Sequence, residues 1–333
     1  MQYFRLYKFA LKASRTKEAN WTQSTVAEPT DLSNAQATFE KILYDAFKED
    51  RRLPIGKDPE TGDKVLPNSI IRNTNYVTMF KLHNPKNVNI WELKGGKVSM
   101  ESFPYSYIII DNRPGIGQMA IQMKTEAWND PEVVAKLLEE NLNRILKDSG
   151  TGLEIEIRHK WLPTDFFEYV KQRRKDEGVI VKRLYFEFTN PQFETPVETA
   201  IETSGHLRQL MNMLSQLGGA KARLQVDAPR KNELIKRKLR DIKQMVSLVA
   251  SNGYSLKVDF SDKTNYNCNE WLLADVDMDD KILSDFITGQ MHQLFEFELF
   301  HWLDKKRHET KEYQDDERPL RQKPARKNRK LVS

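Results

Sequence analysis

The sequence predicts an α+β fold, in which an N-terminal antiparallel β-meander with helices packs on a C-terminal two-layer α/β sandwich. Three observations predict it. In the first half, short strand-like runs follow one another through tight turns such as Gly95-Gly96, which is typical of antiparallel hairpins. In the second half, strand-like and helix-like segments alternate. The strands there have one apolar and one charged face, whereas strands covered on both faces are apolar throughout.

The length of 333 residues is typical of two domains. We expect residues 1–150 to form the β-meander domain with two helices, because the second helix opens at Asp130-Pro131 and ends at Gly150. Residues 151–304 then form the alternating β/α two-layer domain, and residues 305–333 form a disordered basic tail.

Within residues 1–150, apolar residues recur at helical spacing in two segments and at strand spacing in six. We expect helices over residues 34–49 and 131–150, and strands over residues 3–11, 76–82, 88–93, 97–101, 106–111 and 117–124. Short connections join the last five strands, which predicts an antiparallel meander.

Residues 151–304 alternate between the two spacings. We expect strands over residues 153–160, 179–188, 222–226, 254–260 and 271–276, and helices over residues 163–174, 197–215, 231–250 and 280–303. In the first of these strands, Leu153 and Ile155 alternate with Glu154 and Glu156. Successive side chains of a strand point to opposite faces, so we expect helices on one face of this sheet and water or a polar partner on the other.

The formal net charge of +5 is concentrated at the C-terminal end. Residues 318–333 contain no acidic residue and seven basic ones: Arg318, Arg321, Lys323, Arg326, Lys327, Arg329 and Lys330. This segment has almost no apolar residues, so burial cannot offset the entropy lost on ordering, and we expect disorder. A basic disordered arm commonly binds nucleic acid. The alternative is a solubilising end without a partner.

The segment over residues 231–250 predicts a basic amphipathic helix. Ile235, Leu239 and Ile242 begin an apolar stripe. Seven basic residues flank this stripe: Arg230, Lys231, Lys236, Arg237, Lys238, Arg240 and Lys243. Such a helix can follow a phosphate backbone without reading bases. The alternative is a solvated outer helix face.

Part of the second half resembles a known group of proteins. Residues 181–191 read Val-Lys-Arg-Leu-Tyr-Phe-Glu-Phe-Thr-Asn-Pro, and a helix, a short strand, the basic helix and a strand after Asn252-Gly253 follow. Over residues 179–260, this order resembles uncharacterised bacterial proteins associated with mobile elements and anti-phage defence. The resemblance implies an intracellular bacterial protein with a defence role. It implies no catalytic residue.

A second functional class is a metal-dependent nuclease. Glu154, Glu156, Arg158 and Lys160 share one face of the predicted strand, and metal nucleases combine acidic pairs with a nearby lysine. Alternating charges on a half-exposed strand give the same pattern. In the nuclease alternative, Glu156 is essential for cleavage.

A third class is a structural subunit of a protein complex. The predicted helix over residues 280–303 is apolar nearly all round in its second half, which is typical of a buried helix. It belongs to the core or docks a protein partner or a second copy through Phe295, Leu299 and Trp302.

Other features of the sequence exclude further classes of protein. Cys268 is the single cysteine, so internal disulfides and cysteine-based zinc sites are excluded. No phosphate loop opens a helix, and no two histidines have metal-ligand spacing, so we expect no cofactor and no metal. Arg5 and Lys8 interrupt any signal-peptide core, and no apolar run approaches a membrane span. We therefore expect a cytoplasmic protein whose main partner is nucleic acid, without membrane contact.

Overall fold

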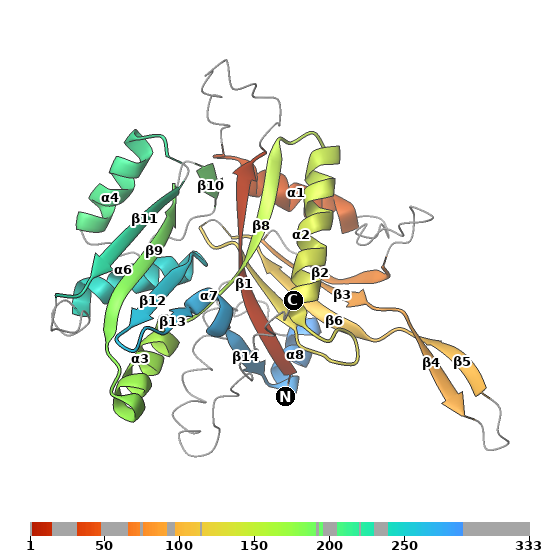
Figure 1. Ribbon diagram of the computed structural model, residues 1–333. Helices are drawn as coiled ribbons and strands as arrows, with labels where there is room; N and C mark the ends of the chain where they lie inside the picture. The colour runs from red at the N-terminus through yellow and green to blue at the C-terminus, as the bar shows by residue number, and fades with distance from the viewer. Residues whose placement is uncertain are drawn as a thin grey trace, which may run out of the picture.

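One long strand, β1 (Gln2–Ala13), lies at the centre of the larger sheet in the computed structural model (Figure 1). The structure describes residues 2–14, 32–47, 66–73, 76–91, 97–113, 115–190, 193–195, 205–219, 221–229 and 239–288. Four strands pair with β1, and all four run antiparallel to it. Their registers overlap along β1, so β7 and β10 pair with one edge of it and β8 and β14 with the other.

Every pairing described in the larger sheet is antiparallel, so the predicted α+β class with a large antiparallel sheet is confirmed. The sheet continues from β1 through β7, β6 and β3 to β2. Its other strands are β2 (Asn68–Asn73), β3 (Val77–His83), β6 (Tyr105–Asp111), β7 (Gln118–Gln122), β8 (Leu153–His159), β10 (Glu194–Thr195) and β14 (Asp275–Met278).

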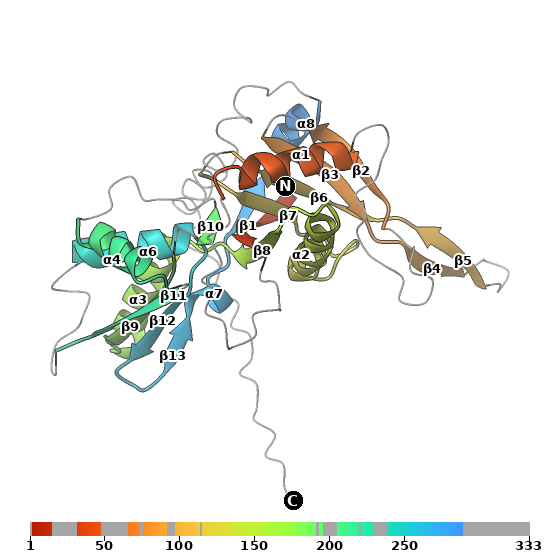
Figure 2. The same ribbon diagram turned by 90° about the horizontal axis from the view of Figure 1, so that it is seen from above.

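The predicted meander is corrected at one place. Among the described strands, β4 (Lys86–Trp91) and β5 (Lys97–Ser102) pair only with each other, as a hairpin that projects from the body of the molecule (Figures 1 and 2). β3 instead pairs directly with β6 along its whole length. The apolar residues of β3 and β6 lie in the core, whereas Val88 and Met100 of the hairpin are about half exposed. Burial therefore favours the pairing of β3 with β6.

The larger sheet has an apolar core on each face. On one face, α1 (Ala35–Phe47) and α2 (Pro131–Asp148) cover Phe9 and its neighbours. Asp130 caps α2 by accepting a hydrogen bond from the Glu132 backbone N–H at 3.0 Å. On the other face, α8 (Asp280–Ile287) packs against Phe4 and Leu6.

The smaller sheet has four antiparallel strands in the order β11-β9-β12-β13. Its strands are β9 (Val181–Thr189), β11 (Lys221–Asp227), β12 (Leu256–Phe260) and β13 (Asn265–Asn267). Its helices are α3 (Pro163–Glu177), α4 (Gly205–Gln216), α6 (Leu239–Ser251) and α7 (Cys268–Trp271). Phe186, Leu256 and Val258 face the helices and are fully buried.

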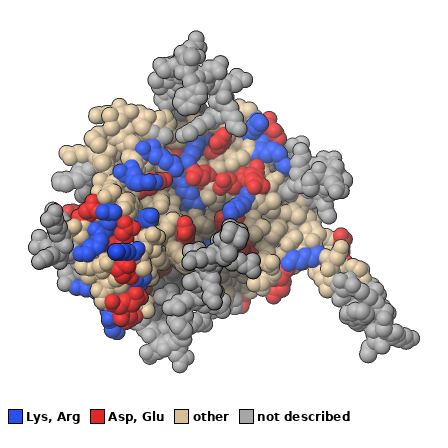
Figure 3. All heavy atoms as spheres, viewed as in Figure 1, with Lys and Arg blue, Asp and Glu red and all other residues tan. Residues whose placement is uncertain are grey.

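The opposite face of the smaller sheet carries charges of both signs, as its alternating pattern predicts. Arg183 forms ion pairs with Asp227 and Asp259, and Glu187 pairs with two basic residues of β11. Figure 3 shows basic and acidic side chains interleaved over this part of the molecule. Cross-strand pairs of opposite charge stabilise an exposed sheet face modestly.

The prediction that residues 153–160 belong to the second sheet is wrong. β8 pairs with β1 through seven consecutive residues, from Tyr7 with His159 to Ala13 with Leu153. β14 also returns to β1, and Trp271 ends α7 instead of beginning a strand. The chain therefore does not pass from one sheet to the other at residue 150. Alternation along β8 reports one buried face, but it does not identify the strand that pairs with it.

Two sequence predictions cannot be compared with the structure. The basic tail over residues 305–333 and the second half of the predicted helix over residues 280–303 lie outside the described residues. Within the described ranges, no helix has both the length and the apolar character that a membrane crossing requires.

The turn between α6 and β12, which leads into the smaller sheet, packs against the larger sheet. Gly253, at φ +63°, lies so close to β1 and β8 that a Cβ atom there would stand 3.1 Å from the Arg158 Cβ, 3.2 Å from the His159 carbonyl oxygen and 3.3 Å from the Lys8 Cβ. Only glycine combines this backbone conformation with so close an approach. The Trp161 indole N–H also donates to the Tyr254 carbonyl oxygen at 3.2 Å.

Gly253→Ala should lower the free energy of unfolding by about 3 kcal/mol, because it adds both backbone strain and a collision between the sheets. The matched control is Gly178→Ala, since Gly178 has φ +68° and a Cβ atom there would meet no other described part of the chain within 4 Å. This control should lose only about 1 kcal/mol. Urea unfolding measures both values, and equal losses would contradict a close contact at Gly253.

Candidate functional site

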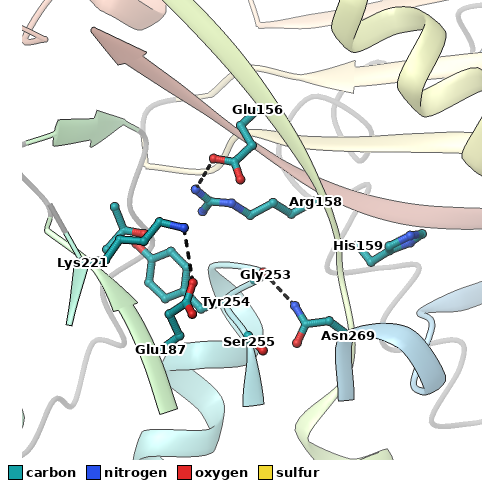
Figure 4. A pocket seen from close by; sticks show the side chains of 10 residues that line it. Glu156, Arg158, His159, Glu187, Lys221, Gly253, Tyr254, Ser255 and Asn269 are labelled. Carbon is teal, nitrogen blue, oxygen red and sulfur yellow. Dashed lines mark hydrogen bonds and ion pairs between the residues drawn. The ribbon is translucent and has the colours of Figure 1, made fainter. Parts of the chain in front are cut away.

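A shallow cleft with a volume of about 260 Å³ lies where β8 of the larger sheet faces the smaller sheet. Glu156 and Arg158 are on one side, and Glu187 and Lys221 are on the other (Figure 4). The rest of its lining comprises His159, Thr189, Gly253, Tyr254, Ser255 and Asn269. The His159 side chain turns away from the cleft, and its Nε2 lies 2.7 Å from Glu132 Oε2.

A buried carboxylate holds the cleft together. Glu194, which is 2% exposed, accepts hydrogen bonds from Arg158 at 2.7 and 3.3 Å and another from the Tyr254 hydroxyl. Burial raises the pKa of Tyr254, and the adjacent Glu194 charge raises it further. Tyr254 therefore stays protonated and acts as a donor. This group joins β8 and β10 to the segment that precedes β12.

The residues of the nuclease alternative contact other side chains of the larger sheet or its flanks. Glu156 accepts a hydrogen bond from Arg158 at 2.8 Å and pairs with Lys12. Glu154 accepts one from the Ser14 hydroxyl at 2.8 Å. Lys160 is buried and donates to the Gln118 side chain at 2.8 Å.

These four side chains share one sheet face as predicted, but they do not form a metal-binding group. Across the residues that the structure describes, no cluster of three or more His, Cys, Asp or Glu side chains has an arrangement that could hold a metal ion. An acidic group matched to neighbouring cations is typical of a structural ion-pair network.

The open side of the cleft carries a more exposed group of charges. Glu187 pairs with Lys221 and Arg223, both at 3.3 Å. Burial opposes ionisation of Glu187, but the hydrogen bond from Arg223 and the charge of Lys221 hold its pKa below the usual value. Because Lys221 and Arg223 are more than half exposed, we expect these pairs to contribute little to stability.

The described part of the predicted basic helix is α6. Ile242, Val246 and Val249 are buried, so the predicted apolar stripe is confirmed at these positions. Lys243 is exposed, and its Nζ lies 5.9 Å from the centre of the Phe167 ring. Arg240 lies in α6, but its side chain is outside the described part of the chain.

The other predicted contact residues all lie outside the described ranges. These are Arg230, Lys231, Lys236, Arg237, Lys238, Phe295, Leu299, Trp302 and the seven basic residues after Glu317.

Cys268 is fully buried, and burial raises the pKa of its thiol. A thiol with a raised pKa is poorly suited to act as a nucleophile.

Sequence reasoning missed the buried centre of the cleft. Glu194 lies in a two-residue strand, which is too short to show a periodic pattern. The sequence does indicate a turn at Asn252-Gly253, but no local pattern shows that this turn reaches β1 and β8.

Comparison with protein-family models, with curated proteins and with solved structures finds no match to this chain.

Glu194→Gln should lower the free energy of unfolding by about 3 kcal/mol, because it leaves the largely buried Arg158 without its buried counter-charge. Glu187→Gln is the matched control, since its carboxylate pairs with exposed cations, and it should lose less than about 1 kcal/mol. Chemical denaturation of both variants measures the difference. A loss for Glu194→Gln no larger than that of the control would show that the buried pair does not stabilise the fold.

Proposed function

We propose that this protein is a non-enzymatic nucleic-acid-binding protein that acts through phosphate contacts, in a bacterial cytoplasmic anti-phage setting. The observation that carries the proposal is the concentration of basic residues in two segments. Residues 318–333 contain seven Lys and Arg and no acidic residue, and residues 230–243 contain seven basic and two acidic residues. Such clusters release counterions when they contact phosphates, and this favours binding without sequence preference.

The structure of α6 is compatible with this role. Its apolar stripe is buried against the smaller sheet, and the polar positions Asp241 and Lys243 are exposed. Lys243, on the polar side of this helix, is thus directed to the surface and not into the core. The resemblance over residues 179–260 supplies the defence setting of the proposal.

The other two classes have less support. The residues of the nuclease alternative pair with Lys12, Arg158 and Gln118. Nothing in the described residues favours docking through Phe295, Leu299 and Trp302, which lie outside them. Nucleic-acid binding is therefore the one function proposed.

Fluorescence anisotropy with labelled duplex DNA and single-stranded RNA, over a salt series, tests the proposal. The full-length protein should bind, with a steep negative slope of log K against log salt. Deleting residues 318–333 should make the slope on duplex less negative by up to about 6, since each phosphate contact contributes about 0.9. A full-length variant with the seven basic tail residues changed to Gln should match the truncation. Absence of binding at low salt would contradict the proposal.

A further inference from the structure

Five side chains of three neighbouring segments meet on one face of the larger sheet, at the base of the β4–β5 hairpin. This Lys–Tyr cluster consists of Lys81, His83, Tyr105, Tyr107 and Lys124. The register of β3 and β6 places Lys81 opposite Tyr107 and His83 opposite Tyr105. All five residues are partly exposed, so a ligand can reach them.

Both lysines lie against the same aromatic ring. The ammonium group of Lys81 is 4.4 Å from the centre of the Tyr105 ring, and that of Lys124 is 4.6 Å from it. The two tyrosine rings are 5.3 Å apart in an edge-on arrangement. Tyr107 also packs on the apolar core beneath α8, so a buried foundation holds the cluster in place.

The cluster carries positive charge that no described carboxylate offsets at close range. Lys12, Lys136 and Lys221 each pair with a carboxylate, whereas in the described ranges Lys81 and Lys124 have none within ion-pair distance. Two ammonium groups beside one ring repel each other, and an anion bound between them would relieve that repulsion. The ring contacts keep both groups in place without neutralising them.

The lysine charges also act on the tyrosine hydroxyl groups. A hydrogen bond from Tyr107 lowers the pKa of Tyr105, and the charges of Lys81 and Lys124 lower it further. Burial raises the pKa of Tyr107, so this hydroxyl keeps its proton. The cluster therefore offers two ammonium groups on one surface, and such groups contact phosphate oxygens in nucleic-acid interfaces.

We infer that the Lys–Tyr cluster binds the phosphodiester backbone of a nucleic acid. The inference rests on the proposed function and adds a contact site within the folded body, separate from α6 and the tail. The cluster lies on an outer sheet face with partly exposed side chains, which suits a passing phosphate backbone.

The test compares full-length wild type with Lys81→Ala/Lys124→Ala by anisotropy on duplex DNA over a salt series. The double variant should bind more weakly, and its slope of log K against log salt should be less negative by about 2. Lys81→Arg/Lys124→Arg keeps both charges and should retain the wild-type slope. Matching urea midpoints establish that the variants are folded.

The matched control is Lys221→Ala/Arg223→Ala, which also removes two positive charges, but both of these already pair with the carboxylate of Glu187. Its slope should stay close to wild type. A wild-type slope in Lys81→Ala/Lys124→Ala, or an equal change in the control, would overturn the cluster and leave the proposed function standing. If the wild type itself does not bind nucleic acid, the proposed function and the cluster both fall.

Discussion

Both edges of β1 are hydrogen-bonded along most of its length, and the rest of the structure depends on this shared strand. β7 and β10 occupy one edge, and β8 and β14 occupy the other. These four partners come from widely separated parts of the chain, so β1 fixes where each part lies. Its two faces also belong to two different cores, with Phe9 in one and Phe4 in the other. A strand that is paired at both edges and packed on both faces can hold polar side chains only where other polar groups hydrogen-bond or pair with them.

That condition explains the charged centre between the two sheets. Lys12 and Arg158 lie beside the buried Glu194, and their own side chains are only 24% and 11% exposed. Burying a charge is costly unless a counter-charge and hydrogen bonds compensate it. Glu194 provides this compensation from β10 and also engages Tyr254. Arg158 of β8 therefore has a structural role in this ion-pair network.

The sequence predicted the local elements well and their partners less well. Alternation of apolar and charged residues correctly indicated the buried face of β9 and β12, because side-chain direction in a strand is a local property. The same alternation in β8 could not show that β1 pairs with it, since pairing depends on residues more than a hundred positions away. The candidate site divides in the same way. The apolar stripe of α6 was predictable from its spacing, whereas the meeting of Arg158 with Glu194 needed the folded chain.

The pairing of β1 with β14 has a consequence for biosynthesis. Gln2 lies opposite Met278, and Arg5 lies opposite Asp275. β1 leaves the ribosome well before β14 and therefore keeps part of an edge unpaired until β14 has been made. Contacts of such long sequence separation form slowly, and unpaired strand edges are prone to association with other chains. The nascent protein thus has a period of exposure to aggregation that the finished sheet does not have.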